Sequence, residues 1–318
     1  MTRRTRAILV VATALAAAAG VVGGAAFLGG DDEPEAARPP GAPPVLVDLG
    51  VRSDPEARAL RRAVQLHSRG QRQKARELFA QQDSLQAQAA EAIAAWPDGT
   101  LARLEELALD HPGSGAVQFH LGLARFWSGD TDGAVEAWRA ARTRDPDTVF
   151  AVRAADLIYR RFPPGLPTFV PSFQGPREVR SLGAEKQLAA LERNARPQNF
   201  RAKLLYGVAL QRVDRPVSAR RQFAAAAKLA PRSADAQVAD AVGRFDKEQP
   251  ERAFSRLGPL ARRFPKAATV RFHLGLLLLW LGDVEEAKRQ LSRATRLGPP
   301  LSREAKRLLD RLEAVQQR

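Results

Sequence analysis

Four prolines in the second half of the chain lie 34 residues apart, at Pro197, Pro231, Pro265 and Pro299. Each of the last three closes the same pattern of small residues. Counting back 24, 12 and 5 positions from them gives Gly207, Ala219 and Ala226, then Ala241, Ala253 and Leu260, then Gly275, Ala287 and Ala294. A fixed period of this length indicates one supersecondary unit repeated along the chain.

The same spacing continues toward the N-terminus. It recurs at Gly122, Ala134, Ala141 and Pro146, and Pro112 lies another 34 residues earlier. Two copies are nearly identical, FHLGLARFWSGD from Phe119 and FHLGLLLLWLGD from Phe272. Repeats are therefore expected over most of the chain.

Each repeat is predicted to be two amphipathic α-helices joined by a tight turn. Apolar residues recur three and four positions apart on both sides of a Gly-Asp pair, such as Gly129-Asp130. This pattern resembles the tetratricopeptide repeat, whose 34-residue period carries Leu-Gly, Ala, a bulky apolar residue, Ala and Pro at these offsets. The resemblance covers residues 56–318 and implies an all-α, right-handed solenoid of antiparallel helix pairs.

One interval breaks the period, because Pro146 and Pro197 lie 51 residues apart, which is 34 plus 17. Helices are expected from about residue 148 to 162 and from about 181 to 195. Between them, residues 163–176 (PPGLPTFVPSFQGP) are too rich in proline for a helix or a central strand. This insert is also too apolar for an idle surface loop. We expect it to pack over the groove as a lid or ligand mimic, with a structural plug as the alternative.

The two ends of the repeat domain have patterns of their own. A final helix is expected over residues 302–316, whose Lys and Arg face would cap the solenoid. At the other end, residues 31–55 carry Pro, Gly and acidic residues with little periodicity, which is typical of a semi-rigid linker.

The N-terminus carries a membrane signal. Basic residues in MTRRTR precede 24 uncharged residues, 7–30, which as a helix would span about 36 Å, enough for a hydrocarbon core of about 30 Å. Residues 1–30 are therefore predicted to be a cytoplasmic stub and transmembrane anchor, with the repeats outside the cytoplasm. A cleaved signal peptide, and hence a secreted protein, is the alternative because Ala17-Ala18-Ala19 satisfies an A-x-A rule.

Composition excludes several kinds of site. The chain has no cysteine, so disulfides, thiolate metal sites and a lipid-modified cysteine are unavailable. No phosphate-cradling glycine loop, G-x-S-x-G or H-E-x-x-H motif is present. The sequence therefore predicts a non-enzymatic protein without cofactor or metal. His120 and His273 share one position in the two FHLG sequences, and we interpret them as structural rather than as a metal pair.

Candidate peptide-binding residues lie on the helices expected to line the concave groove. In proteins with this repeat, the first helix of each pair forms that surface. Aromatic anchors there would be Phe119, Trp127 and Trp280, with packing between repeats as the alternative for the two tryptophans. A basic wall would be formed by Arg153, Arg160, Arg161, Arg201 and Arg212, able to attract an acidic peptide.

Two functions remain open at this stage. The first is a protein-protein interaction scaffold at the outer face of a bacterial plasma membrane, which binds peptide segments in the groove. The alternative is a basic solenoid that binds a polyanion, which the net charge of +15 and the pI of about 11.1 favour. An anionic cell-surface polymer suits an exported protein better than nucleic acid.

Overall fold

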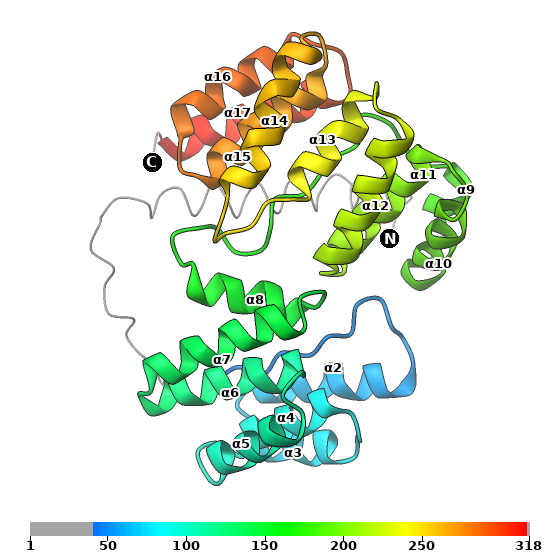
Figure 1. The fold of residues 1–318 in the computed structure, drawn as a ribbon. Coiled ribbons are helices and arrows are strands. Elements are labelled where there is room, and N and C mark those ends of the chain that lie inside the picture. The colour runs from blue at the N-terminus through cyan, green and yellow to red at the C-terminus, as the bar shows by residue number, and fades with distance from the viewer. Residues whose placement is uncertain (1–40, 317–318) are drawn as a thin grey trace. The chain divides into compact units, whose positions relative to one another are not determined.

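The computed structural model describes residues 41–316, and every regular element in that range is an α-helix (Figure 1). The described chain divides into two compact units, an N-terminal unit of residues 41–158 and a C-terminal unit of residues 159–316. The predicted membrane anchor, residues 1–30, lies outside the described residues. Within residues 41–316, the helices are too short or too polar to cross a membrane.

The N-terminal unit consists of three antiparallel helix pairs followed by a single helix. The first helices of the pairs contact one another from α4 to α6 and from α6 to α8. The bounds are α2 Pro55–Ser68, α3 Arg72–Ala80, α4 Leu85–Ala94, α5 Thr100–Asp110, α6 Gly115–Ser128, α7 Thr131–Arg144 and α8 Val149–Ile158.

The C-terminal unit also contains three helix pairs and a closing helix, preceded by the single turn α9 and the helix α10. Its first helices α11, α13, α15 and α17 contact one another in that order. The bounds are α9 Arg177–Arg180, α10 Ala184–Ala195, α11 Phe200–Arg212, α12 Pro216–Leu229, α13 Ala234–Val242, α14 Glu251–Arg263, α15 Ala268–Trp280, α16 Val284–Thr295 and α17 Leu301–Gln316.

The Gly-Asp pairs form the turns inside the repeats, as the sequence predicts. Gly129 ends α6 with a φ of 99°, a left-handed conformation that favours glycine. Asp130 then caps α7, because its side chain accepts a hydrogen bond from the backbone N–H of Gly133. Gly282 has a φ of 80° and Asp283 caps α16 in the same way. One dipeptide thus ends the first helix and starts the second.

Small residues hold the paired helices close together. A Cβ atom at Gly207 would lie 2.3 Å from a ring carbon of Phe223, and one at Gly122 would lie 2.4 Å from the Trp138 ring. Both large side chains are buried between the helices of their pairs. The aromatic residue of the second helix therefore occupies the space that the missing side chain leaves.

Replacing Gly207 with alanine is expected to destabilise the C-terminal unit by about 1–3 kcal/mol, because the new methyl group overlaps the Phe223 ring. Chemical denaturation followed by circular dichroism would measure it. If the contact is the cause, the double variant Gly207→Ala, Phe223→Leu loses less than the sum of the two single variants. If the two losses of unfolding free energy simply add, the contact with Phe223 is not the cause of the destabilisation.

The closing helix α17 spans Leu301–Gln316, the range over which the sequence predicts a final helix. Its apolar residues Ala305, Leu308 and Leu312 are buried against the preceding pair, while Lys306 and Arg307 are exposed. The apolar surface of the last repeat is thereby covered by a helix with a charged outer face.

The helix expected over residues 148–162 is shorter than predicted, because α8 ends at Ile158. A residue that precedes proline is disfavoured in the helical conformation, and Phe162 precedes Pro163. Phe162 is instead buried edge-on against Phe245, with ring centroids 6.1 Å apart. Arg160 and Arg161 therefore lie in a turn, and their predicted place on the first helix was wrong.

Candidate functional site

Residues 42–49, here called the N-terminal strap, form an extended segment on the first helices of the N-terminal unit. Figure 1 draws it as the blue coil that leads into α2. Pro43 and Leu49 are buried, and Leu46 packs against the cluster around α6. These residues do not form the free linker predicted for residues 31–55. Their apolar side chains pack against the repeats.

Three hydrogen bonds hold the N-terminal strap to three helices. His67 of α2 donates from Nε2 to the Pro43 carbonyl oxygen over 2.9 Å. The backbone N–H of Leu46 donates to Nε2 of His120 in α6 over 3.2 Å. The backbone N–H of Asp48 donates to Oε1 of Gln86 in α4 over 2.8 Å. All three hydrogen bonds engage the strap's backbone, so they depend on its extended shape.

The insert, residues 163–176, lies on the first helices of the C-terminal unit in a similar way and is called the C-terminal strap. It contains no helix or strand, as predicted. The backbone N–H of Val170 donates to Nε2 of His273 in α15 over 2.9 Å. That of Phe169 donates to Oε1 of Gln211 in α11 over 3.1 Å, and the Ser172 hydroxyl donates to the carboxylate of Asp235 in α13.

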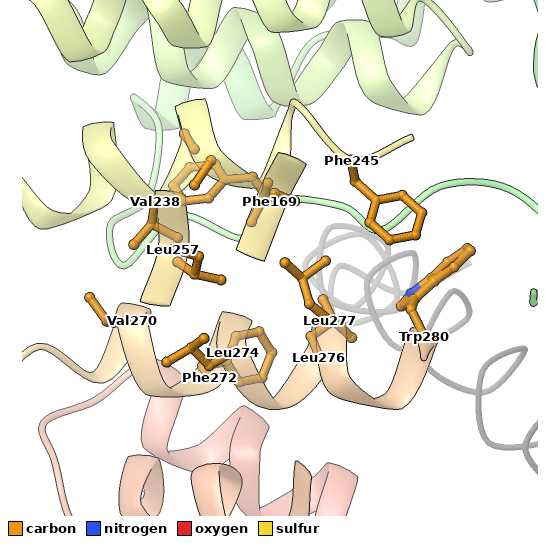
Figure 2. Close-up of a cluster of buried hydrophobic side chains, with 14 of the residues drawn as sticks. Phe169, Val238, Phe245, Leu257, Val270, Phe272, Leu274, Leu276, Leu277 and Trp280 are labelled. Carbon is orange, nitrogen blue, oxygen red and sulfur yellow. The ribbon is translucent and has the colours of Figure 1, made fainter. Parts of the chain in front are cut away.

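Phe169 anchors the C-terminal strap in the core, with only 1% of its surface exposed. Its ring stacks on His273, with centroids 5.1 Å apart and planes inclined by 21°, and meets Phe223 edge-on at 5.6 Å. Figure 2 shows it in one cluster with Val238 of α13 and Leu277 of α15. The strap is thus part of the hydrophobic core of this unit.

Lys247 fixes the start of the C-terminal strap. Its side chain is 1% exposed, and its Nζ donates to the Pro163 carbonyl oxygen over 2.7 Å. The same ammonium group lies 5.6 Å from the centre of the Trp280 ring, within the range of a cation-π interaction. Nothing in the repeat pattern marks this lysine, because it lies in the irregular segment between α13 and α14.

His120 and His273 are neutral hydrogen-bond acceptors at the centre of each strap site. Their Nδ1 atoms donate to the carbonyl oxygens of Ala116 and Thr269 over 2.7 Å, which leaves Nε2 unprotonated and able to accept. Burial lowers the pKa of each imidazole to about 4. Among residues 41–316, no group of three potential ligands could hold a metal ion.

The three predicted aromatic anchors lie within or against the cores of their units. Phe119 is buried beside His120 with ring centroids 5.5 Å apart, and Trp127 is half-buried against Phe126. Trp280 is buried edge-on against Phe245. The packing interpretation accounts for these contacts, and their role in peptide binding stays a prediction.

The five predicted arginines do not share one helix surface. Arg153 belongs to the N-terminal unit, where it is half-buried and forms an ion pair with Asp156 at 3.0 Å. The others belong to the C-terminal unit. Arg160 and Arg161 follow α8, with Arg161 over the Phe162 ring, whereas Arg201 and Arg212 are exposed at the two ends of α11. Of these arginines, Arg201 and Arg212 share one first helix, α11, beside the C-terminal strap.

The helix pair α6–α7 is the part of the chain that matches a known protein family. Residues 116–148 match the family model of the tetratricopeptide repeat. The described chain is therefore a helical repeat protein in which residues 116–148 are similar to a tetratricopeptide repeat. The helices α11, α13 and α15 begin 34 residues apart, as do α6 and α8, whereas α2, α4 and α6 begin 30 residues apart. No curated protein matches the sequence.

Solved structures with similar helical repeats share little sequence with this chain. A tetratricopeptide repeat protein from Parabacteroides merdae is 12% identical, with 81% of this chain and 98% of that chain covered and a TM-score of 0.35. Yeast Tom70 is 14% identical, with 93% and 69% covered and a TM-score of 0.33. The TPR2AB domain of yeast Sti1, in complex with pHSP90, is 12% identical, with 81% and 98% covered and a TM-score of 0.30.

Proposed function

We propose that this chain is a non-enzymatic interaction scaffold that holds extended segments of partner proteins on the first helices of its tetratricopeptide-like repeats. The observation that supports the proposal is that both units already hold extended chain there, through backbone hydrogen bonds to His120 and His273. A surface that binds the backbone in this way can hold an extended segment, and holding a segment requires no catalytic group.

The partner segment is proposed to be acidic where it passes α11. Arg201 and Arg212 are exposed at the two ends of this helix. Both lie beside the C-terminal strap, because the Arg201 guanidinium is 5.4 Å from the centre of the Phe173 ring and Arg212 follows Gln211, which binds Phe169. Guanidinium groups at these positions would form charge-assisted hydrogen bonds with carboxylates.

Photocrosslinking in cells tests the scaffold proposal and supplies the partner. A photoreactive residue placed at position 212 should capture one recurrent protein. The same residue at position 307, on the exposed side of α17, should not capture it. Equal capture at both positions, or none at position 212, would contradict binding on the first helices.

Removing Arg201 and Arg212 together is expected to weaken binding of the captured partner by at least about 100-fold. Each charge-assisted hydrogen bond contributes about 1.5–3 kcal/mol when partly desolvated. The control is Arg289→Ala with Arg307→Ala, which removes two exposed arginines paired with Glu286 and Glu304. Exposed pairs contribute only about 0–1 kcal/mol, so this variant should bind almost normally.

The salt dependence of the same titration separates a peptide partner from a polyanion. Equal affinity of the two double variants, together with steep weakening by salt, would favour diffuse binding of an anionic polymer.

We also propose that residues 7–30 anchor the chain in a bacterial plasma membrane, with the repeats at its outer face. The basic residues before this apolar stretch favour that orientation. Protease added to intact spheroplasts should then digest the repeats. Protection until lysis would reverse the orientation, and a mature N-terminus near Gly20 would indicate a secreted protein.

A further inference from the structure

The two straps bind their units through the same central contact. One strap residue donates its backbone N–H to a buried histidine, Leu46 to His120 and Val170 to His273. The two histidines lie 153 residues apart and occupy one position in the FHLG sequences of α6 and α15. The contact is therefore repeated at equivalent places in the two units.

A second contact recurs two residues further along each strap. The backbone N–H of Asp48 donates to Gln86, and the hydroxyl of Ser172 donates to the carboxylate of Asp235. Gln86 and Asp235 are each the second residue of the first helix that precedes the histidine's helix, α4 and α13. The straps thus run in the same direction and register across two successive first helices.

The strap residues that contact the helices also belong to the same classes. Each strap has a buried proline three residues before the histidine-bonded residue, an apolar residue one before it and another three after it. The matched pairs are Pro43 with Pro167, Val45 with Phe169, and Leu49 with Phe173. The shared pattern is Pro-x-apolar-apolar-x-polar-apolar.

We infer that the first helices of each unit form one kind of peptide site, which binds an extended segment with this pattern, and that each strap is its resident ligand. A partner segment of this class would bind by replacing the strap. The inference rests on the proposed function and gives its partner a chemical class. Leaving the Nε2 acceptor of either histidine without a donor inside the core costs free energy. A competing ligand must therefore supply a backbone N–H at the same place.

The two straps also indicate which backbone N–H groups the site does not need. The residue after the histidine-bonded one is Val47 in one strap and Pro171 in the other. Proline has no N–H, so this position cannot require a donor. N-methylation of a peptide at the Leu46 nitrogen should therefore weaken binding, whereas methylation at the Val47 nitrogen should be tolerated.

Fluorescence anisotropy with labelled peptides tests the inference on the full chain. The variant Val45→Ser, Leu49→Ser weakens the N-terminal strap, and the probe is a synthetic peptide of residues 41–50. We expect it to bind this variant at least about 10-fold more tightly than the unaltered chain. Methylation at Leu46 should weaken it by about 10-fold or more, and methylation at Val47 by less than about threefold. A peptide of residues 165–174 should also bind.

Equal effects of the two methylations, or failure of the second peptide to bind, would overturn the inference. If the serine variant does not fold, a chimera in which residues 43–49 are replaced by residues 167–173 provides the test. Its amide at position 46 should remain protected from hydrogen exchange, and a chimera with the same residues scrambled should lose that protection. Failure of the peptides while position 212 still captures a partner would reject the ligand class and leave the scaffold function standing.

Discussion

Truncation of Phe169 to alanine is expected to lower the free energy of unfolding of the C-terminal unit by about 3–5 kcal/mol. The ring is 1% exposed and packs between Phe223 and His273, so its removal leaves a cavity in the core. Hydrogen exchange measured by mass spectrometry in increasing denaturant would follow the two units separately. Amides of α11 to α15 should lose protection together with the strap.

The variant Phe173→Ala is the matched control, because this ring lies on the same strap but is only half-buried under Arg201. Phe173→Ala should lower the free energy of unfolding by less than about half as much as Phe169→Ala. A loss of protection confined to the strap in Phe169→Ala would contradict a role in the core, and it would make the insert a lid rather than a part of the unit.

Acid is expected to destabilise the C-terminal unit through His273. Burial lowers the pKa of this imidazole to about 4, below its ordinary value of 6.5. As the pH falls from about 6.5 to about 4, the unfolded chain binds a proton that the folded chain does not. The free energy of unfolding should therefore fall by about 1.4 kcal/mol per pH unit, or about 3 kcal/mol in total. Above pH 6.5 the imidazole is neutral in both states, so it adds no further pH dependence to the free energy of unfolding.

The variant His273→Gln separates this effect from the titration of carboxylates. Denaturant titrations from pH 7 to pH 4 should show a shallower loss of stability for the variant, by about the amount above. His111 lies in the N-terminal unit, so His111→Gln should leave the pH dependence of the C-terminal unit unchanged. Parallel curves for the unaltered chain and His273→Gln would show that the buried imidazole is not the titrating group.

The repeat pattern was sufficient to predict the Gly-Asp turns inside the repeats. Gly129 and Gly282 end helices, and Asp130 and Asp283 start the next ones, because the residue types at a turn follow from local backbone geometry. The absence of helix and strand in residues 163–176 followed from proline in the same way. Each of these inferences depends only on neighbours along the chain.

The strap contacts could not be predicted because they join distant residues and lack periodicity. His120 accepts from a backbone N–H 74 residues away, and His273 from one 103 residues away. Any residue except proline can donate a backbone N–H, so the sequence does not show which residue binds the histidine. The repeated histidine could be recognised in the sequence, but its role as an acceptor could not be predicted. Residues 42–49 were interpreted as part of a linker because residues 31–55 carry Pro, Gly and acidic residues with little periodicity.

Hydrogen exchange of two backbone amides tests the central claim most directly. If the straps are built into the units through His120 and His273, the amides of Leu46 and Val170 are hydrogen-bonded donors. They should then exchange far more slowly than the same amides in an unstructured peptide, because exchange requires release of the strap or unfolding of the unit. Rapid exchange of both strap amides while α6 and α15 remain protected would contradict the account.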